Sequence, residues 1–391
     1  MNLHAVATVF RKETRDNARD RRTLFRVFLF GPLLGPIIFA GMMNAVISMN
    51  LGSATKALDL PVAGAQYAPN LIAFLRSHHA NIKPAPDDPA AAVKAGMADV
   101  VLKIPASYPK DFVAGRPAEV EVVLDAASQS GAAPVRRVKA LLNAYSSQLA
   151  SLRLLARGVN PSATHPLAIV DQDVSTPTAR GAMLMGMVPY FCLFATLMGG
   201  FYLAIDTTAG ERERGSLEPL LGTAASRPSL MLGKLCATAF YSVCALAIAV
   251  AAFGVAIPTV PAAELGMQLN FGAYEAMWIF AVCVPFVFLG AAGLTVIAAF
   301  SRSFKEAQAW MSVALIVPVL PLIFVAVHPV HSQWWMMLIP SLSQDLLIMT
   351  VMKGNPIDGG FFALSIVSTL VVAGVLAAYA MRLYRRERLL V

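Results

Sequence analysis

Charged residues are scarce in this sequence. Asp, Glu, Lys and Arg together make up 14% of its 391 residues, whereas hydrophobic residues make up 57%. Ordinary soluble proteins carry about a quarter of their residues as charges, so this composition excludes an ordinary soluble globule. It predicts a polytopic α-helical membrane protein instead.

Cysteine and grouped metal ligands are also scarce. The chain has four cysteines, and all of them lie in hydrophobic runs: Cys192, Cys236, Cys244 and Cys283. A disulfide framework in a water-soluble part of the chain is therefore excluded. The pairs His78 with His79 and His328 with His331 have no cysteine or carboxylate cluster beside them, so we expect no metal site.

The sequence lacks the motifs of ATP-binding and hydrolytic enzymes. It has no Gly-x-x-x-x-Gly-Lys-Ser/Thr loop, and Gly233 and Lys234 are followed by Leu235. The His-Glu-x-x-His and Gly-x-Ser-x-Gly signatures are missing as well. We therefore expect no catalytic residue and no cofactor on this chain, and any energy source for it would be external.

Hydrophobic runs long enough to cross a bilayer occur six times. The predicted spans are residues 24–49, 183–205, 231–257, 276–300, 309–327 and 361–381. Lys and Arg number seventeen in the segments on one side of these spans, against only Lys353 in the short loops on the other side. The positive-inside rule then places both termini in the cytoplasm.

The same rule gives the predicted cytoplasmic segments. They are an amphipathic helix over 1–23, loops over 206–230 and 301–308, and a tail over 382–391. The net charge of +8 could suggest a nucleic-acid partner, but its basic residues gather beside hydrophobic runs. We therefore expect a lipid bilayer and no nucleic acid as its surroundings.

The sequence pattern over residues 51–181 predicts a large α/β domain on the extracytoplasmic side, between the first two spans. Residues 99–105 and the alternating pattern at 120–124 are typical of strands. Residues 70–79 and 136–157 carry apolar side chains at helical spacing. About 130 residues are enough to bury a core without disulfides.

Residues 331–352 form a shorter apolar segment before the last span. Polar residues and Pro340 interrupt it, and a seventh crossing here would place the basic C-terminal tail outside. We interpret it as a re-entrant element, covered by protein where its backbone is broken. An amphipathic helix lying at the interface explains the segment equally well.

A charged island lies between the second and third spans, from Gly210 to Leu221. On a continuous helix, Glu211, Gly215 and Glu218 would share one face at i, i+4 and i+7. That face could offer charges to a soluble partner while the leucines pack under the membrane. The alternative is a solvated loop whose charges only end the flanking helices.

The island resembles the cytoplasmic loop of ABC exporter permeases of the second bacterial class, above all the sodium-extrusion permeases. Other segments resemble the same family in order along nearly the whole chain. The segments that carry the resemblance are 211–221, 226–227, 233–235, 11–13, 19–22, 99–105, 157–159, 303–308 and 386–390.

The resemblance implies a half-transporter of the bacterial cytoplasmic (inner) membrane. Two permease copies, as a homodimer or a heterodimer, would pair with two ABC ATPase subunits that bind ATP and Mg. The 211–221 loop would be the coupling helix that docks on the ATPase. A second contact is predicted at 301–308, where a short positive-inside loop is an equally good interpretation. The candidate coupling residues are Glu211, Arg212, Gly215, Glu218, Arg302, Phe304, Lys305 and Glu306.

The substrate is less constrained by the sequence. The middle thirds of the spans hold no carboxylate and no histidine, although ion-driven transporters usually bury such groups there. A sodium path would need hard oxygen ligands, and the candidates are Asn44, Ser341, Ser343, Gln344 and Asp345. Export of drugs, peptides or lipids along a Met- and Phe-rich interior is an alternative. An alternative function of a different class is a membrane-anchored sensor or scaffold with a ligand-binding outer domain.

Overall fold

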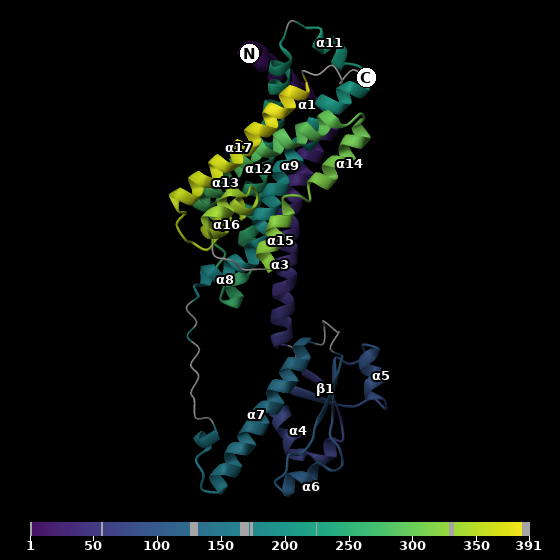
Figure 1. The fold of residues 1–391 in the computed structure, drawn as a ribbon. Helices are drawn as coiled ribbons and strands as arrows, with labels where there is room; N and C mark the ends of the chain where they lie inside the picture. Colours follow the sequence, from purple (N-terminus) through teal and green to yellow (C-terminus); the bar gives the residue numbers. More distant parts are fainter. Residues whose placement is uncertain are drawn as a thin grey trace. The chain divides into compact units, whose positions relative to one another are not determined.

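A computed structural model describes residues 2–55, 58–125, 132–164, 172, 175–223, 225–327 and 332–384 (Figure 1). The chain divides into two compact units. The helical unit comprises Met1–Ile47 and Val174–Val391, and the α/β unit comprises Ser48–Asp173.

Within the described residues, the helical unit contains six helical segments that are long and apolar enough to cross a membrane, as many as the sequence predicts. They are Thr23–Ser48, Pro177–Glu213, Arg227–Thr259, Ala273–Phe300, Phe304–Val325 and Gly359–Leu383. The elements that precede α12 are α1 (Leu3–Arg19), α2 (Arg21–Phe25), the π-helical turn η1 (Arg26–Phe30), α3 (Gly31–Thr55), α8 (Pro177–Leu184), η4 (Met185–Met187), α9 (Val188–Ile205), the π-helical turn η5 (Asp206–Gly210), α10 (Glu211–Glu213) and α11 (Leu217–Leu221). Those that follow are α12 (Arg227–Ala256), η6 (Ile257–Thr259), η7 (Ala262–Leu265), α13 (Ala273–Phe300), α14 (Phe304–Ala314), α15 (Val319–Val327), η8 (Trp334–Leu338), α16 (Leu342–Met352) and α17 (Gly359–Leu383).

Glycines allow α9 and α12 to lie against each other. A Cβ atom added at Gly199 would lie 2.6 Å from Cβ of Ala245, and one at Gly200 would lie 2.7 Å from Oγ of Ser242. Both distances are shorter than side-chain atoms tolerate, so any larger residue would push the helices apart. This contact positions the end of α9 beside the start of α12.

The fifth span differs from its prediction. It begins at Phe304, so most of the loop expected over 301–308 is helical, and it is broken between α14 and α15. Tighter i to i−3 bonds replace the helical ladder there, such as Val317 N to the Ala314 carbonyl at 3.2 Å. Pro318 explains the break, because it lacks an N–H and disfavours helical backbone in the residue before it.

The segment predicted over 331–352 contains η8 and α16, and its residue 331 lies outside the described residues. Helix α16 has 11 residues, and nine of them are buried. A helix of that length is too short to cross a hydrocarbon core of about 30 Å. A re-entrant and an interfacial position both stay predictions.

The α/β unit has a four-stranded sheet in the order β2-β1-β3-β4, with β1 parallel to β2 and β3 and with β3 antiparallel to β4. The sequence indicated two of these strands, β3 and β4. The elements are β1 (Leu58–Ala63), η2 (Ala65–Tyr67), α4 (Pro69–Ser77), β2 (Ala80–Pro84), α5 (Pro89–Lys94), β3 (Val100–Lys103), α6 (Tyr108–Val113), β4 (Glu121–Leu124), α7 (Ala132–Ala156) and η3 (Pro161–Thr164).

One face of the sheet is covered by α4 and α7 (Figure 1). The buried side chains of Leu60, Val100 and Leu102 pack there with Leu71 and Leu75 of α4. Because side chains alternate along a strand, the buried Val101 faces the other side, where α5 contacts β3 and β4. The unit therefore has a core of its own. Its extracytoplasmic location stays a prediction.

Candidate functional site

The charged island begins on the turn that extends α9. The Thr207 hydroxyl donates to the Leu203 carbonyl at 2.8 Å, and the Thr208 hydroxyl donates to the Ala204 carbonyl. These bonds lie in the π-helical turn η5, a local widening of the helix that often occurs at functional positions. The Thr207 carbonyl accepts a hydrogen bond from Nζ of Lys234 on α12 at 2.5 Å.

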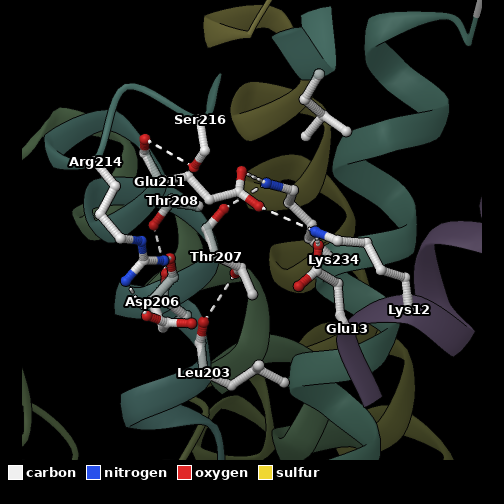
Figure 2. Close-up of polar contacts among 12 residues, drawn as sticks. Lys12, Glu13, Leu203, Asp206, Thr207, Thr208, Glu211, Arg214, Ser216 and Lys234 are labelled. Carbon is white, nitrogen blue, oxygen red and sulfur yellow. Dashed lines mark hydrogen bonds and ion pairs between the residues drawn. The ribbon is translucent and has the colours of Figure 1, made fainter. Parts of the chain in front are cut away.

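Four charged side chains meet at this point, and we call them the charge cluster: Lys12, Glu13, Glu211 and Lys234. The Glu211 carboxylate lies between two ammonium groups (Figure 2). One oxygen accepts from Lys234, and the other accepts from Lys12 of α1 at 3.4 Å. Lys12 also donates to Glu13 at 3.0 Å. Two positive and two negative charges thus compensate one another.

Burial makes this compensation necessary. The side chains of Lys234 and Glu211 are 1% and 8% exposed, whereas that of Lys12 is 47% exposed. Burial raises the pKa of Glu13, and the charges of Lys234 and Lys12 offset part of that rise. For Lys12, the carboxylates of Glu13 and Glu211 outweigh burial and raise the pKa. A buried charge without its partner would be strongly unfavourable.

Helix α1 is held along α12 by further contacts. A Cβ atom at Gly233 would lie 2.7 Å from Cβ of Val9, so the two helices touch closely there. The Tyr241 hydroxyl donates to the Thr14 carbonyl at 3.0 Å. At the start of α1, the Asn2 backbone N–H donates to the Ser229 hydroxyl at 3.2 Å. The charge cluster therefore joins an N-terminal helix to the loop side of α9 and α12.

The next two residues of the island bond to other helices. Arg212 donates to the carbonyls of Ser301 at 2.8 Å and Ala299 at 2.9 Å, which lie at the C-terminal end of α13. The Glu213 carboxylate accepts from the backbone N–H of Phe304 at 2.7 Å, at the first residue of α14. Each charge matches the end of the helix dipole that it meets. The island thus connects α13 and α14 to α9.

The remaining part of the island corrects the prediction of one continuous helix. Helix α10 ends at Glu213, and Gly215 has φ +68°, a left-handed conformation that suits glycine. Helix α11 then starts at Leu217, so Glu211, Gly215 and Glu218 do not share one helical face. Gly215 is exposed, and the side chain of Glu218 lies outside the described part of the structure. The short sequence pattern could not reveal this break.

Residues 301–308, the second predicted contact with the ATPase, partly serve to cap the start of helix α14. The Glu306 carboxylate accepts from the Arg302 backbone N–H at 2.7 Å, and the Ser303 hydroxyl accepts from the Glu306 backbone N–H at 3.3 Å. Phe304 is half-buried, whereas Arg302 and Lys305 have exposed side chains. The cations at this position are therefore the groups available to a partner.

The candidate substrate-path residues are brought together only in part. Gln344 donates to the hydroxyls of Ser365 at 3.4 Å and Thr369 at 3.1 Å on α17, and its carbonyl accepts from the Ser341 N–H at 2.6 Å. The Ser343 hydroxyl accepts from Ser365 at 2.9 Å. These bonds attach α16 to α17, which leaves Ser341, Ser343 and Gln344 with few free ligand atoms.

Asn44 and Asp345 behave differently from that group. The Asn44 amide lies on α3 and donates to the Ala40 carbonyl at 2.9 Å. Asp345 is 7% exposed, and in the described part of the chain its carboxylate forms no hydrogen bond or ion pair. Within the same part, no group of three His, Cys, Asp or Glu side chains could hold a metal ion. Asp345 is thus a buried acid without a hydrogen bond or close ion pair among the described residues, and the nearby positive charge that acts on it is that of Lys353.

Comparison with known proteins identifies the family. The model of the family described as "ABC-2 family transporter protein" matches residues 26–381. The chain belongs to this ABC-2 family. It is also 26% identical over 326 residues to the ABC transporter permease protein NatB of Bacillus subtilis (strain 168), which covers 82% of each chain. This ABC-2 chain is therefore a permease subunit of an ABC transporter, a membrane protein whose family associates with an ATPase subunit.

Sequence reasoning found Glu211 in this ABC-2 permease but missed the other members of the charge cluster, Lys12, Glu13 and Lys234. Lys234 carried a usable signal, because it is the single formal charge inside two long apolar runs and such a charge usually has a partner. Lys12 and Glu13 carried none. They lie more than 190 residues away in a segment rich in charge, so only the packing of α1 on α12 reveals the contact.

Proposed function

We propose that this ABC-2 permease is the transmembrane subunit of an ATP-driven exporter and that it exports sodium ions from the bacterial cytoplasm. Two copies would pair with two ATPase subunits that bind ATP and Mg. The observation that carries the proposal is the charge cluster, because it connects the predicted coupling loop to α12 through the buried Lys234–Glu211 ion pair and to α1 through the half-exposed Lys12.

The proposed coupling has an outer and an inner part. The outer part would be α11 with the exposed Gly215, together with the exposed cations Arg302 and Lys305. The inner part would be Glu211 and Arg212, whose bonds to α12 and α13 transmit movement of the loop to the spans. A rigid connection of this kind is required because ATP binds to a different subunit.

Sodium as the cargo is supported by two features. The sequence resembles sodium-extrusion permeases over nearly its whole length, and Asp345 is a buried carboxylate without an ion-pair partner in the described structure. Carboxylate and carbonyl oxygens are the ligands that hard cations prefer. We propose Asp345 as the acidic group of the sodium path.

A cavity in the helical unit favours apolar cargo as a second candidate. It has a volume of about 440 Å³ and lies among α9, α13, α17, the α14–α15 break and residues 339–341. Its walls are apolar except at Ser341. Cavities of this size and lining hold small apolar ligands. A drug or a lipid chain would fit this chemistry better than an ion would.

Transport in sealed vesicles tests these proposals. The permease and the ABC ATPase that co-purifies with it would be reconstituted, and ATP-dependent movement of sodium would be measured beside that of an apolar dye. Sodium transport that is lost in Asp345→Asn but retained in Asp358→Asn, a helix cap outside the path, supports the sodium path. Dye transport without sodium transport supports the apolar alternative. If no ATPase binds and neither cargo moves, the exporter proposal is wrong.

The proposed topology is tested separately. Both termini and the 206–230 loop would lie in the cytoplasm of a cell with the chain in its inner membrane. Single cysteines at exposed positions Arg302 and Gly96 would be labelled by an impermeant maleimide in inside-out and right-side-out vesicles, respectively. Labelling of both positions from one side would contradict the assignment.

A further inference from the structure

The α/β unit contains a groove for which the proposed transport function gives no role. It lies among α4, α6, α7 and the segment from Arg116 to Val120, and its volume is about 460 Å³. Small-molecule sites commonly have volumes of about 300–1,000 Å³. The groove is therefore of a size that holds one small organic molecule.

The inner surface of the groove is apolar and aromatic. Leu71 of α4, Phe112 of α6 and Leu149 of α7 line it. The rings of Tyr108 and Phe112 are stacked, with centroids 5.7 Å apart and planes inclined by 19°. A smaller cavity of about 150 Å³ adjoins the groove and shares Leu71, Tyr108, Phe112 and Tyr145 with it. This surface suits a flat ring system or a short hydrocarbon chain.

A guanidinium group stands at the side of this apolar surface. Arg153 of α7 lies 4.9 Å from the centroid of the Phe112 ring, and one of its nitrogens donates to the Phe112 carbonyl at 2.9 Å. Among the described residues, no carboxylate forms an ion pair with Arg153. Its other N–H groups can therefore bind an anion. The contacts with Phe112 hold the group in place, which reduces the entropy lost on binding.

The surrounding charges leave the groove positive. Arg116 also lines it, but this residue pairs with Asp111 at 2.6 Å. Arg157 approaches the same end, since a Cβ atom at Gly115 would lie 3.9 Å from its Nη2. No Asp or Glu occurs among the described residues that line the groove. The charge of Arg153 is therefore not neutralised by its surroundings.

Tyr108 and Tyr145 do not change the positive charge of the groove. Burial raises the pKa of Tyr108 to about 12, with a smaller contribution from Tyr145. Burial raises the pKa of Tyr145 as well. Both phenols stay protonated at neutral pH and can donate hydrogen bonds. Asn143 and Ser146 add exposed polar groups on α7.

We propose that this groove binds a small amphiphilic organic acid, with its apolar body against Phe112 and Leu149 and its carboxylate on the Arg153 guanidinium. A planar guanidinium forms paired, charge-assisted hydrogen bonds with a carboxylate. A cationic ligand would meet Arg153 without a compensating acid, and a purely apolar ligand would leave that group unused. The α/β unit is thus a ligand-binding domain of the permease.

The test uses the full chain in nanodiscs of zwitterionic lipid, with 2-naphthoate as the probe. Hydrogen–deuterium exchange would be measured with and without the probe. We expect saturable protection confined to peptides that cover residues 104–120 and 141–157. The positively charged 2-naphthylmethylammonium ion, which has the same ring, should give no such protection at equal concentration.

Three variants make the assignment specific. Arg153→Gln should weaken 2-naphthoate binding by about tenfold or more, because it removes charge-assisted hydrogen bonds. Ser146→Phe should abolish binding by filling the groove from an exposed position that tolerates a larger side chain. Arg136→Gln, on the same helix but not among the groove residues, is the matched control and should bind as the unchanged protein does.

Other outcomes would overturn the proposal. Equal protection by the anion and the cation, or equal affinity in Arg153→Gln and Arg136→Gln, would show that the guanidinium does not select the ligand. Protection that occurs without the probe and depends on anionic lipid in the nanodisc would assign the groove to a lipid headgroup. These measurements need no ATPase and no transport, so their result is independent of the exporter proposal.

Discussion

Replacing Lys234 by methionine would test the charge cluster directly. The Lys234 side chain is 1% exposed and donates to both the Thr207 carbonyl and the Glu211 carboxylate. Methionine fills a similar volume but carries no charge. Glu211 would remain buried, with the half-exposed Lys12 at 3.4 Å as its remaining cation.

The expected loss of stability follows from this geometry. Removing one member of a buried ion pair costs about 3–5 kcal/mol, because the other charge stays buried without compensation. Lys12→Met should cost at most about 1 kcal/mol, since Lys12 is 47% exposed and its interactions are screened by water. Glu211→Gln combined with Lys234→Met removes both charges. This double variant should lose less unfolding free energy than the two single variants lose together, by about 1–3 kcal/mol.

The measurement is the unfolding free energy in detergent at fixed pH and salt. Alkylation of the buried thiols of Cys192 and Cys283 reports unfolding, because both side chains are inaccessible in the folded chain. Lys305→Met, at an exposed position on α14, is the matched control for loss of a lysine. If Lys234→Met were as stable as this control, or if the double variant lost the full sum, the buried pair would be refuted.

Three further predictions concern the surroundings of the cluster. Gly233→Leu should displace α1, since even a Cβ atom there would lie 2.7 Å from Cβ of Val9. Faster hydrogen exchange over residues 3–19 would show this displacement. The control Gly374→Leu has open space around it and should leave exchange over residues 3–19 unchanged. Arg212→Gln should lower the unfolding free energy by about 2–3 kcal/mol through loss of charge-assisted bonds to α13, and unchanged stability would contradict this. Burial raises the pKa of Glu13 above its ordinary value of 4.5, so its contribution to stability falls as the pH rises from 4.5 through the raised pKa. Glu13→Gln should therefore reduce the slope of melting temperature against pH in that window, and an unchanged slope would disprove the assignment.

The number of spans could be predicted from the sequence because hydrophobic length alone determines it. The ends of the spans could not. The second span continues through η5 to Glu213, because the charges that suggested a loop are neutralised within the chain and Thr207 and Thr208 bond to the preceding turn. The fifth span begins earlier than its hydrophobic run, at Phe304, and it breaks before Val319 at Pro318.

In the α/β unit, the apolar pattern of the sequence predicted two of the four strands, β3 and β4, but not β1 and β2. Strand β3 is apolar from Val100 to Leu102, and β4 lies within the apolar alternation of residues 120–124, whereas β2 carries polar residues and lies at one edge of the sheet. An edge strand is bonded on one side only and needs less apolar surface. Its pairing with β1 was therefore not visible in the pattern of residues.

The sequence predicted where on the chain the site lies, but not which side chains contact each other there. The sequence singled out Glu211 and Arg212 as charges in an apolar context. It could not show that Glu211 bonds to α1 and α12 or that Arg212 caps α13, because these partners are 23 to 199 residues away. Distant pairs of this kind are set by helix packing rather than by local spacing.

These contacts change how mutations in the loop must be interpreted. A transport defect in Glu211→Ala would follow from disruption of the charge cluster even if Glu211 never touches the ATPase, because its carboxylate is 8% exposed. Arg302 and Lys305 are exposed, and in the described structure neither side chain forms an ion pair. Loss of ATPase binding in their alanine variants, with unfolding free energy unchanged, would therefore identify a docking contact. Only a comparison of binding and stability in the same variants separates docking from internal transmission.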